Sequence, residues 1–233
     1  MHGGAGTIER ERARVALQQA VAGLTTQMRV ARAVVPTVTR VVVAAAAADV
    51  WITRATVSSA LRAGATHLRE MLYWLGVARE CDLVVHALVQ PVWANGYGLL
   101  ATLGSAGERR LGEATMPRDT AVQIQSFGLA VQVVTIAQQV QPEPQNIPVV
   151  EGFVRSGTRI GALLERAMVC HGGLGDPVAL QAAIDCIHET LYWLRVLEVS
   201  QVVTVPVSEP VYADCEALLG LLGNAYATRQ TAG

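Results

Sequence analysis

Cysteine and histidine side chains gather in the second half of the chain, and their types would suit a Zn²⁺ site, because thiolate and imidazole are ligands that zinc prefers. Cys186 and His188 are two positions apart, so on a helix their side chains would point about 200° apart and could not share an ion. We therefore expect no metal and no other cofactor. The residues concerned are Cys170, His171, Cys186, His188 and Cys215.

The four cysteines have wide spacing and no CxxC pair. This pattern is unlike a dense disulfide scaffold and predicts reduced, mostly buried thiols in a cytoplasmic protein.

Motifs of known catalytic sites are missing from the sequence. It contains no Gly-rich loop followed by Lys, no HExxH and no GxSxG. The stretch Gly172-Gly173-Leu174-Gly175 is expected to be a turn between helices. His188-Glu189 is not the Glu-x-x-His motif of di-metal bundles. The sequence therefore predicts a protein that is not an enzyme.

Aromatic residues stand at repeated positions. They could belong to the core or to a subunit interface, or they could stack on nucleic-acid bases. Adjacent helical positions face about 100° apart, so one member of each Tyr-Trp pair is expected in the core and the other at an interface. We favour core and interface roles. The residues are Tyr73, Trp74, Trp93, Tyr192, Trp193 and Tyr212.

Arginines are frequent near the start of the chain, at Arg10, Arg14, Arg29, Arg32 and Arg40. Arg10 and Arg14 are four apart and share a helix face. Two interpretations stay open at this point. One is a solvated face with local ion pairs, since glutamates interleave with these arginines. The other is a strip that contacts phosphates without sequence preference.

These residues lie within an internal repeat with an offset of 119 residues. Residues 70–77 read Glu-Met-Leu-Tyr-Trp-Leu-Gly-Val, and residues 189–196 read Glu-Thr-Leu-Tyr-Trp-Leu-Arg-Val. The same offset aligns residues 91–94 with 210–213, and Leu99-Leu100 with Leu218-Leu219, without a gap. A constant offset over several segments indicates two copies of one structural unit.

Hydrophobic periodicity and breakers predict four helices in each copy. Asp176-Pro177 is expected to begin a helix as N-cap and first residue, and Pro91 and Pro210 are expected to lie at the start of a fourth helix. Paired prolines at residues 141–146 cannot continue a helix and are expected to separate two helices of copy two. Residues 107–119 form the expected linker between the copies. The predicted fold is all-α: two tandem up-down four-helix bundles, residues 1–112 (copy one) and 113–233 (copy two). The predicted helices span 7–30, 33–52, 54–82, 90–110, 121–141, 147–170, 176–202 and 208–229.

Composition points to surfaces buried between subunits. Of the 233 residues, 52% are hydrophobic and only 16% are charged, against a usual charged share of about 25%. Residues 1–119 hold 13 Arg and 9 acidic residues, a net charge of +4, whereas residues 120–233 hold 5 Arg and 10 acidic residues, a net charge of −5. Copy one is thus basic and copy two acidic. We expect a homo-oligomer or a protein partner, because a small bundle otherwise needs more polar surface.

Neither the start of the chain nor its most apolar stretch indicates a membrane protein. The first residues lack the basic and apolar regions of a signal peptide. The stretch 34–52 contains Pro36, Arg40 and Asp49, and charges at the centre of a spanning helix are costly. We expect a buried bundle helix there and no membrane partner.

The third helix of copy two supports a resemblance to a family. Glu189-Thr190-Leu191-Tyr192-Trp193-Leu194, followed by a helix with Leu218-Leu219-Gly220-Leu221-Leu222, resembles the small bacterial four-helix-bundle family. That family includes proteins encoded in intervening sequences of 23S ribosomal RNA genes and the accessory variability determinant of diversity-generating retroelements. The Glu151-Gly152 step and Arg155 resemble its second helix. Copy one matches less fully, since Arg32-Ala33 replaces the Glu-Gly step.

The resemblance implies cyclic homo-oligomers, often pentameric barrels, and for the retroelement members binding to nucleic acid and a reverse transcriptase through basic surfaces. This chain differs from that pattern, because it is a fused double copy and copy two is acidic. We therefore expect a non-enzymatic module that oligomerises or docks into a larger complex. The alternative is an accessory protein that binds RNA or a nucleoprotein through copy one.

Overall fold

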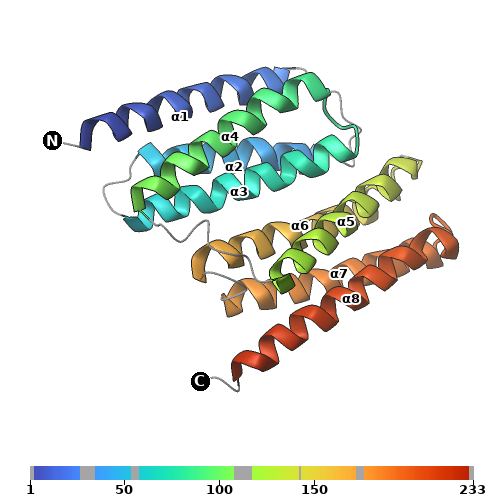
Figure 1. The fold of residues 1–233 in the computed structure, drawn as a ribbon. Helices are drawn as coiled ribbons and strands as arrows, with labels where there is room; N and C mark the ends of the chain where they lie inside the picture. Colours follow the sequence, from blue (N-terminus) through green and yellow to red (C-terminus); the bar gives the residue numbers. More distant parts are fainter. Residues whose placement is uncertain are drawn as a thin grey trace. The chain divides into compact units, whose positions relative to one another are not determined.

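A computed structural model describes residues 3–26, 35–53, 58–107, 117–141, 143–171 and 176–230. Within these residues the secondary structure is entirely helical, which confirms the prediction of an all-α protein. The helices are labelled in Figure 1. They are α1 (Gly3–Thr26), α2 (Val35–Thr53), α3 (Ser58–Glu80), α4 (His86–Gly107), α5 (Pro117–Gln139), α6 (Ile147–His171), α7 (Pro177–Val199) and α8 (Val205–Gln230).

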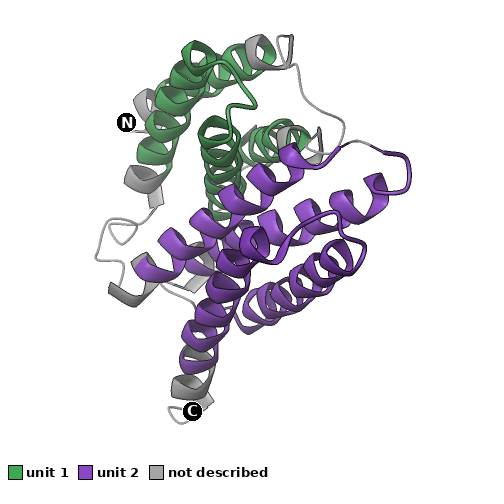
Figure 2. Ribbon diagram, turned by 90° about the vertical axis from the view of Figure 1, so that its right-hand side faces the viewer, with its two compact units in different colours: residues 1–30, 38–114 green, residues 31–37, 115–233 purple. Residues whose placement is uncertain are grey.

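The chain divides into two compact units (Figure 2). Unit 1 comprises Met1–Val30 and Val38–Ala114, and unit 2 comprises Ala31–Thr37 and Thr115–Gly233. The prediction from the sequence placed this boundary between residues 112 and 113, and it assigned residues 31–37 to copy one. Each unit contributes four of the described helices.

Unit 2 is a closed arrangement of four helices. α6 packs against α5 and α7, and α8 also packs against α5 and α7. This ring of contacts encloses one apolar core, which is how amphipathic helices hide their apolar stripes from water. Its fully buried side chains include Leu129, Ile160, Leu164, Ile187, Leu194, Leu218 and Leu222.

Unit 1 is held by the packing of α4 and by individual side-chain contacts of α2. α4 packs against α1 and α3. α2 is joined to α1 by the ion pair between Arg14 and Asp49. It is joined to α3 by a close contact, in which a Cβ added at Gly64 would lie 2.7 Å from Cγ1 of Ile52. Only glycine lets these two helices approach so closely.

The two units share local geometry at the repeat offset. α3 and α7 begin and end 119 residues apart, and α4 and α8 begin 119 residues apart. Asp82 (φ 53°) and Gln201 (φ 59°) both adopt the left-handed conformation after their helices. The Leu83 N–H donates to the Ala78 carbonyl at 2.9 Å, as the Val202 N–H does to Leu197 at 2.9 Å. α3 and α7 therefore end in the same Schellman-type cap, which begins the turn of each α-hairpin.

Several helices begin earlier than predicted: α1 and α5 begin at Gly3 and Pro117 instead of 7 and 121, and two further differences concern helices whose predicted start was marked by proline. α4 and α8 begin at His86 and Val205, before the predicted 90 and 208, so that Pro91 and Pro210 lie inside the helices. Each proline is the sixth helical residue, which is beyond the four initial residues whose N–H groups have no acceptor in the helix, so each proline removes one backbone hydrogen bond. The predicted N-cap is confirmed: Asp176 accepts hydrogen bonds from the backbone N–H groups of Val178 and Ala179.

The break predicted at residues 141–146 is confirmed for the described part of that segment. The predicted linker is partly helical, because α4 includes Gly107 and α5 begins at Pro117. Residues 108–116 and the turn at 172–175 lie outside the described residues.

The membrane candidate differs from the expected one. In the described part of the chain, Ala121–Gln139 of α5 is long and apolar enough to cross a membrane, with a mean hydropathy of 1.2. This segment packs against α6 and α8 of unit 2. The predicted stretch, 34–52, largely coincides with α2, and it is buried along one face only. Val41, Ala44, Ala45 and Ala48 lie on that face.

Candidate functional site

The Tyr-Trp pairs have the same geometry in both units. Tyr73 meets Trp74 edge-on with ring centroids 5.2 Å apart, and Tyr192 meets Trp193 in the same way at 5.1 Å. In each pair the indole N–H donates to the glutamate four residues earlier. The donor–acceptor distance is 3.4 Å from Trp74 to Glu70 and 3.2 Å from Trp193 to Glu189. The repeated Glu-x-x-x-Trp spacing therefore serves this hydrogen bond along one helix face.

A basic residue accompanies each pair. In unit 1 the guanidinium of Arg40 lies 4.8 Å from the centre of the Trp74 ring, in cation–π contact. In unit 2 Arg155 forms an ion pair with Glu189 at 3.5 Å. Burial alone would raise the pKa of Glu70, but His67, Trp74 and Arg40 together lower it below its usual range. Both carboxylates are thus engaged within their own unit.

The two tryptophans lie in different surroundings. Trp74 is fully buried and Tyr73 is buried as well, so in unit 1 neither member of the pair lies at the surface, contrary to the prediction that one of them faces an interface. Trp193 is half-buried against Gly152 of α6, and its partner Tyr192 is exposed. The Glu-Gly step that carries part of the family resemblance therefore has a packing role here, because the glycine makes room for the indole ring.

The third aromatic position has opposite chemistry in the two units. In unit 1 the guanidinium of Arg79 lies 4.5 Å from the centre of the Trp93 ring, which stacks on Tyr97 at 6.2 Å and 21°. In unit 2 the positions of Arg79 and Trp93 are occupied by Glu198 and Tyr212, and the Tyr212 hydroxyl donates to Glu198 at 3.1 Å. A cation–π contact is thus replaced by a hydrogen bond.

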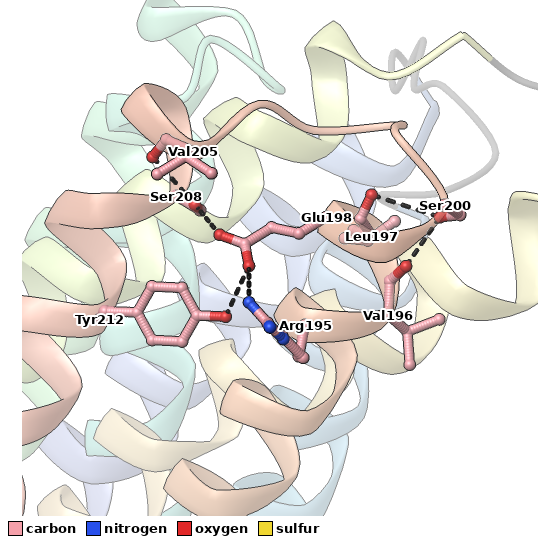
Figure 3. Close-up of polar contacts among 8 residues, drawn as sticks. All are labelled: Arg195, Val196, Leu197, Glu198, Ser200, Val205, Ser208 and Tyr212. Atoms are coloured by element: carbon pink, nitrogen blue, oxygen red, sulfur yellow. Dashed lines mark hydrogen bonds and ion pairs between the residues drawn. The ribbon is translucent and has the colours of Figure 1, made fainter.

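Glu198 is the centre of a polar cluster between α7 and α8 (Figure 3). Its side chain is only 7% exposed and pairs with Arg195 at 3.1 Å. The hydroxyl of Ser208 also donates to it. The Ser208 hydroxyl lowers the pKa of Glu198 most, with Tyr212 and Arg195 adding to the effect against partial burial. Burial and the nearby carboxylate raise the pKa of Tyr212. The cluster fastens the hairpin of unit 2, because every partner of Glu198 lies on α7 or α8.

The predicted basic strip is partly used in ion pairs. Arg14 binds Asp49 of α2 at 2.5 Å and Glu11 at 2.5 Å. These two hydrogen-bonded carboxylates raise the pKa of Arg14 above its ordinary value. Arg10 and Arg40 also have contacts within the chain. Arg29 and Arg32 lie outside the described residues. The geometry of Arg14 matches the first of the two interpretations, local ion pairs.

An apolar face of α2 is exposed. Val43 is 60%, Val50 46% and Trp51 45% exposed. These positions follow a spacing of seven and eight residues, so they lie along one side of the helix. The sequence did not identify this face, because α2 is apolar on all sides and its periodicity does not separate core from surface. The spacing of its large side chains among five alanines was the available signal.

The cysteine and histidine cluster is not assembled in the described part of the chain. Cys81, Cys186 and Cys215 are buried, whereas His188 is exposed. No group of three or more side chains suited to a metal occurs among the described residues. The side chains of Cys170 and His171 lie outside them.

No family model matches the chain, and no curated protein or solved structure is significantly similar to it. The resemblance to the small bacterial bundle family stays a prediction from the motifs.

Proposed function

We propose that this protein is a non-catalytic assembly module that forms a homo-oligomer through the exposed face of α2. The observation that carries the proposal is the row of Val43, Val50 and Trp51 on one side of that helix. Fully burying a large apolar side chain contributes about 1.5–3 kcal/mol, and these side chains are about half exposed, so each would contribute about 1 kcal/mol. The low charged share of the chain, 16%, agrees with a surface that is covered in the assembly.

Native mass spectrometry over a range of protein concentrations tests this proposal. We expect an oligomer whose mass is unchanged by nuclease. Combined replacement of Val43, Val50 and Trp51 by glutamine should leave a monomer with unchanged helicity. The matched control is Ile124→Gln, which changes an exposed apolar residue of α5 and should keep the oligomer. An oligomer that survives the triple replacement, or a wild-type protein that stays monomeric, would refute the proposal.

The fused pair of units also restricts the symmetry of a closed ring. If both units of each chain occupy equivalent places, the ring holds an even number of units. An odd number of units in a closed ring would mean that the two units do not have equivalent roles.

The alternative function is binding of single-stranded RNA by unit 1. The stack of Arg79, Trp93 and Tyr97 favours it, since sequential cation–π and aromatic contacts also form platforms on which bases stack. The net charge of +4 over residues 1–119 also favours RNA binding, because the RNA backbone is negatively charged. Fluorescence anisotropy with a labelled oligonucleotide should then show binding that weakens with salt and is reduced by Tyr97→Leu, but not by Tyr192→Leu. Equal affinity in both variants would exclude this stack as the site.

A further inference from the structure

An apolar cavity of about 360 Å³ opens between α1, α2 and α4 in unit 1. This volume lies within the usual range of small-molecule sites, about 300–1,000 Å³. Its wall is almost wholly aliphatic, and its polar groups are Arg14, Gln18 and Asp49. The apolar lining includes Leu17, Val21, Val42, Ala45, Val50 and Leu99.

The cavity exists because α2 carries small side chains where its counterpart in the repeat carries large ones. Residues 44–48 are five alanines, whereas residues 163–167 read Leu-Leu-Glu-Arg-Ala. Ala45 lines the cavity, and Leu164, at the same repeat position in α6, is fully buried. Replacing a leucine by an alanine removes side-chain volume that the neighbouring helices of unit 1 do not fill.

The polar side of the cavity is formed by Arg14, Gln18 and Asp49, and Glu11, which is 58% exposed, binds Arg14 from outside the lining. Arg14 is bound by two carboxylates, those of Asp49 and Glu11, so this group of three carries a net negative charge. The Arg14 and Asp49 side chains are 16% and 25% exposed. One oxygen of Asp49 accepts a hydrogen bond from Arg14. A carboxylate can accept further hydrogen bonds, because each of its two oxygens has two lone pairs. Arg10, one turn before Arg14, has contacts of its own. A ligand amine could donate to the second oxygen of Asp49 without breaking the existing pair, and the net negative charge of the three groups opposes an anion.

We propose that this cavity binds a small apolar molecule that carries an amine, with its hydrocarbon part among the aliphatic side chains and its ammonium group at Asp49. The charge complementarity selects the amine, and the alanines of α2 provide the space. The site shares Val50 with the exposed face of α2, but Ala45 and Asp49 are not part of that face, so variants at these two positions test the site separately from the assembly role proposed above.

Isothermal titration calorimetry with octylamine, octanoate and 1-octanol tests the proposal on the full chain. We expect octylamine to bind with a negative heat-capacity change, which marks burial of apolar surface. It should bind up to about fivefold more tightly than 1-octanol, as an exposed charge interaction of up to about 1 kcal/mol implies. Octanoate should bind most weakly. Tighter binding of octanoate than of octylamine, or no binding of any of the three, would overturn the proposal.

Two variants separate the contributions of space and charge. Ala45→Leu places the side chain of the unit 2 counterpart in the cavity and should abolish octylamine binding while the protein stays folded. Asp49→Asn should remove the preference for the amine over the alcohol but keep apolar binding. Ala101→Leu, on the exposed surface of α4, is the matched control and should bind octylamine as wild type does. If Ala45→Leu instead changes the oligomer mass and octylamine has no effect, the cavity receives a side chain of another copy and the proposal is wrong.

Discussion

Gly152 of α6 lies directly against the indole of Trp193, so replacing it with alanine tests whether this contact sets the packing of α6 on α7. A Cβ at this position would lie 2.6 Å from Cε2 and 2.9 Å from both Cζ2 and Nε1 of the ring. Favourable contact between carbon atoms begins at about 3.5 Å, so the ring would have to move by about 0.9 Å. The ring is rigid, and its Nε1 is held 3.2 Å from Glu189. The displacement therefore also strains that hydrogen bond.

The expected cost follows from two opposing effects. Overpacking a well-packed site costs about 1–3 kcal/mol, and alanine is favoured over glycine inside a helix by about 0.5–1 kcal/mol. We expect Gly152→Ala to lower the free energy of unfolding by about 1–2 kcal/mol. Gly220 of α8 has open space around its Cβ position. Gly220→Ala should therefore raise the free energy of unfolding by up to about 1 kcal/mol.

Guanidinium unfolding followed by far-ultraviolet circular dichroism measures both variants against wild type. The midpoint should fall for Gly152→Ala and rise for Gly220→Ala. In a Trp193→Phe background the smaller ring leaves space, so the cost of Gly152→Ala should largely disappear, which is the coupling that a double-mutant cycle reports. A midpoint for Gly152→Ala at or above wild type would show that the ring yields freely and that the contact does not set the helix packing.

Three further predictions concern unit 2. Gln201 has a φ of 59°, so Gln201→Gly should raise the free energy of unfolding by up to about 1 kcal/mol. Ser200 has a φ of −80°, so Ser200→Gly should not raise it. A lower unfolding midpoint for Gln201→Gly would contradict the left-handed conformation at this position. The pKa of Glu198 is lowered from 4.5 in the folded state, so its stabilisation is present above that pH and lost as the pH falls through the folded value. Wild type should therefore exceed Glu198→Gln in stability at pH 7 and approach it in acid, and a difference independent of pH would refute this. Burial raises the pKa of the Cys215 thiol to about 12, so iodoacetamide at pH 8 should label it only after unfolding, as peptide mass spectrometry would show.

Sequence patterns predicted the helical elements better than their ends. The N-cap at Asp176 could be identified because an acceptor followed by proline has one favourable place in a helix, its first turn. Pro91 and Pro210 misled the prediction, because each is the sixth residue of its helix and does not lie in the first turn. The signal that was available was Thr204, whose carbonyl accepts hydrogen bonds from Val207 and Ser208 and begins α8.

The candidate sites were less accessible to sequence reasoning. The Glu-x-x-x-Trp spacing was visible, but its hydrogen bond only becomes evident when both side chains are placed on one helix face. Arg14 could be assigned to a helix but not to its partner, because Asp49 is 35 residues away on another helix. Long-range pairs of this kind depend on how the helices pack, which periodicity within one helix does not contain.

The repeat shows how the same hairpin can be stabilised by different chemistry. Arg79 with Trp93 in unit 1 and Glu198 with Tyr212 in unit 2 occupy equivalent positions on the two hairpins. Exchanging only one member would place an arginine beside a tyrosine hydroxyl or a carboxylate against an indole face, and the second arrangement is repulsive, because the ring face is negative. A glutamate at the position of Arg79 therefore requires another residue in place of the Trp93 indole, and unit 2 has Tyr212 there.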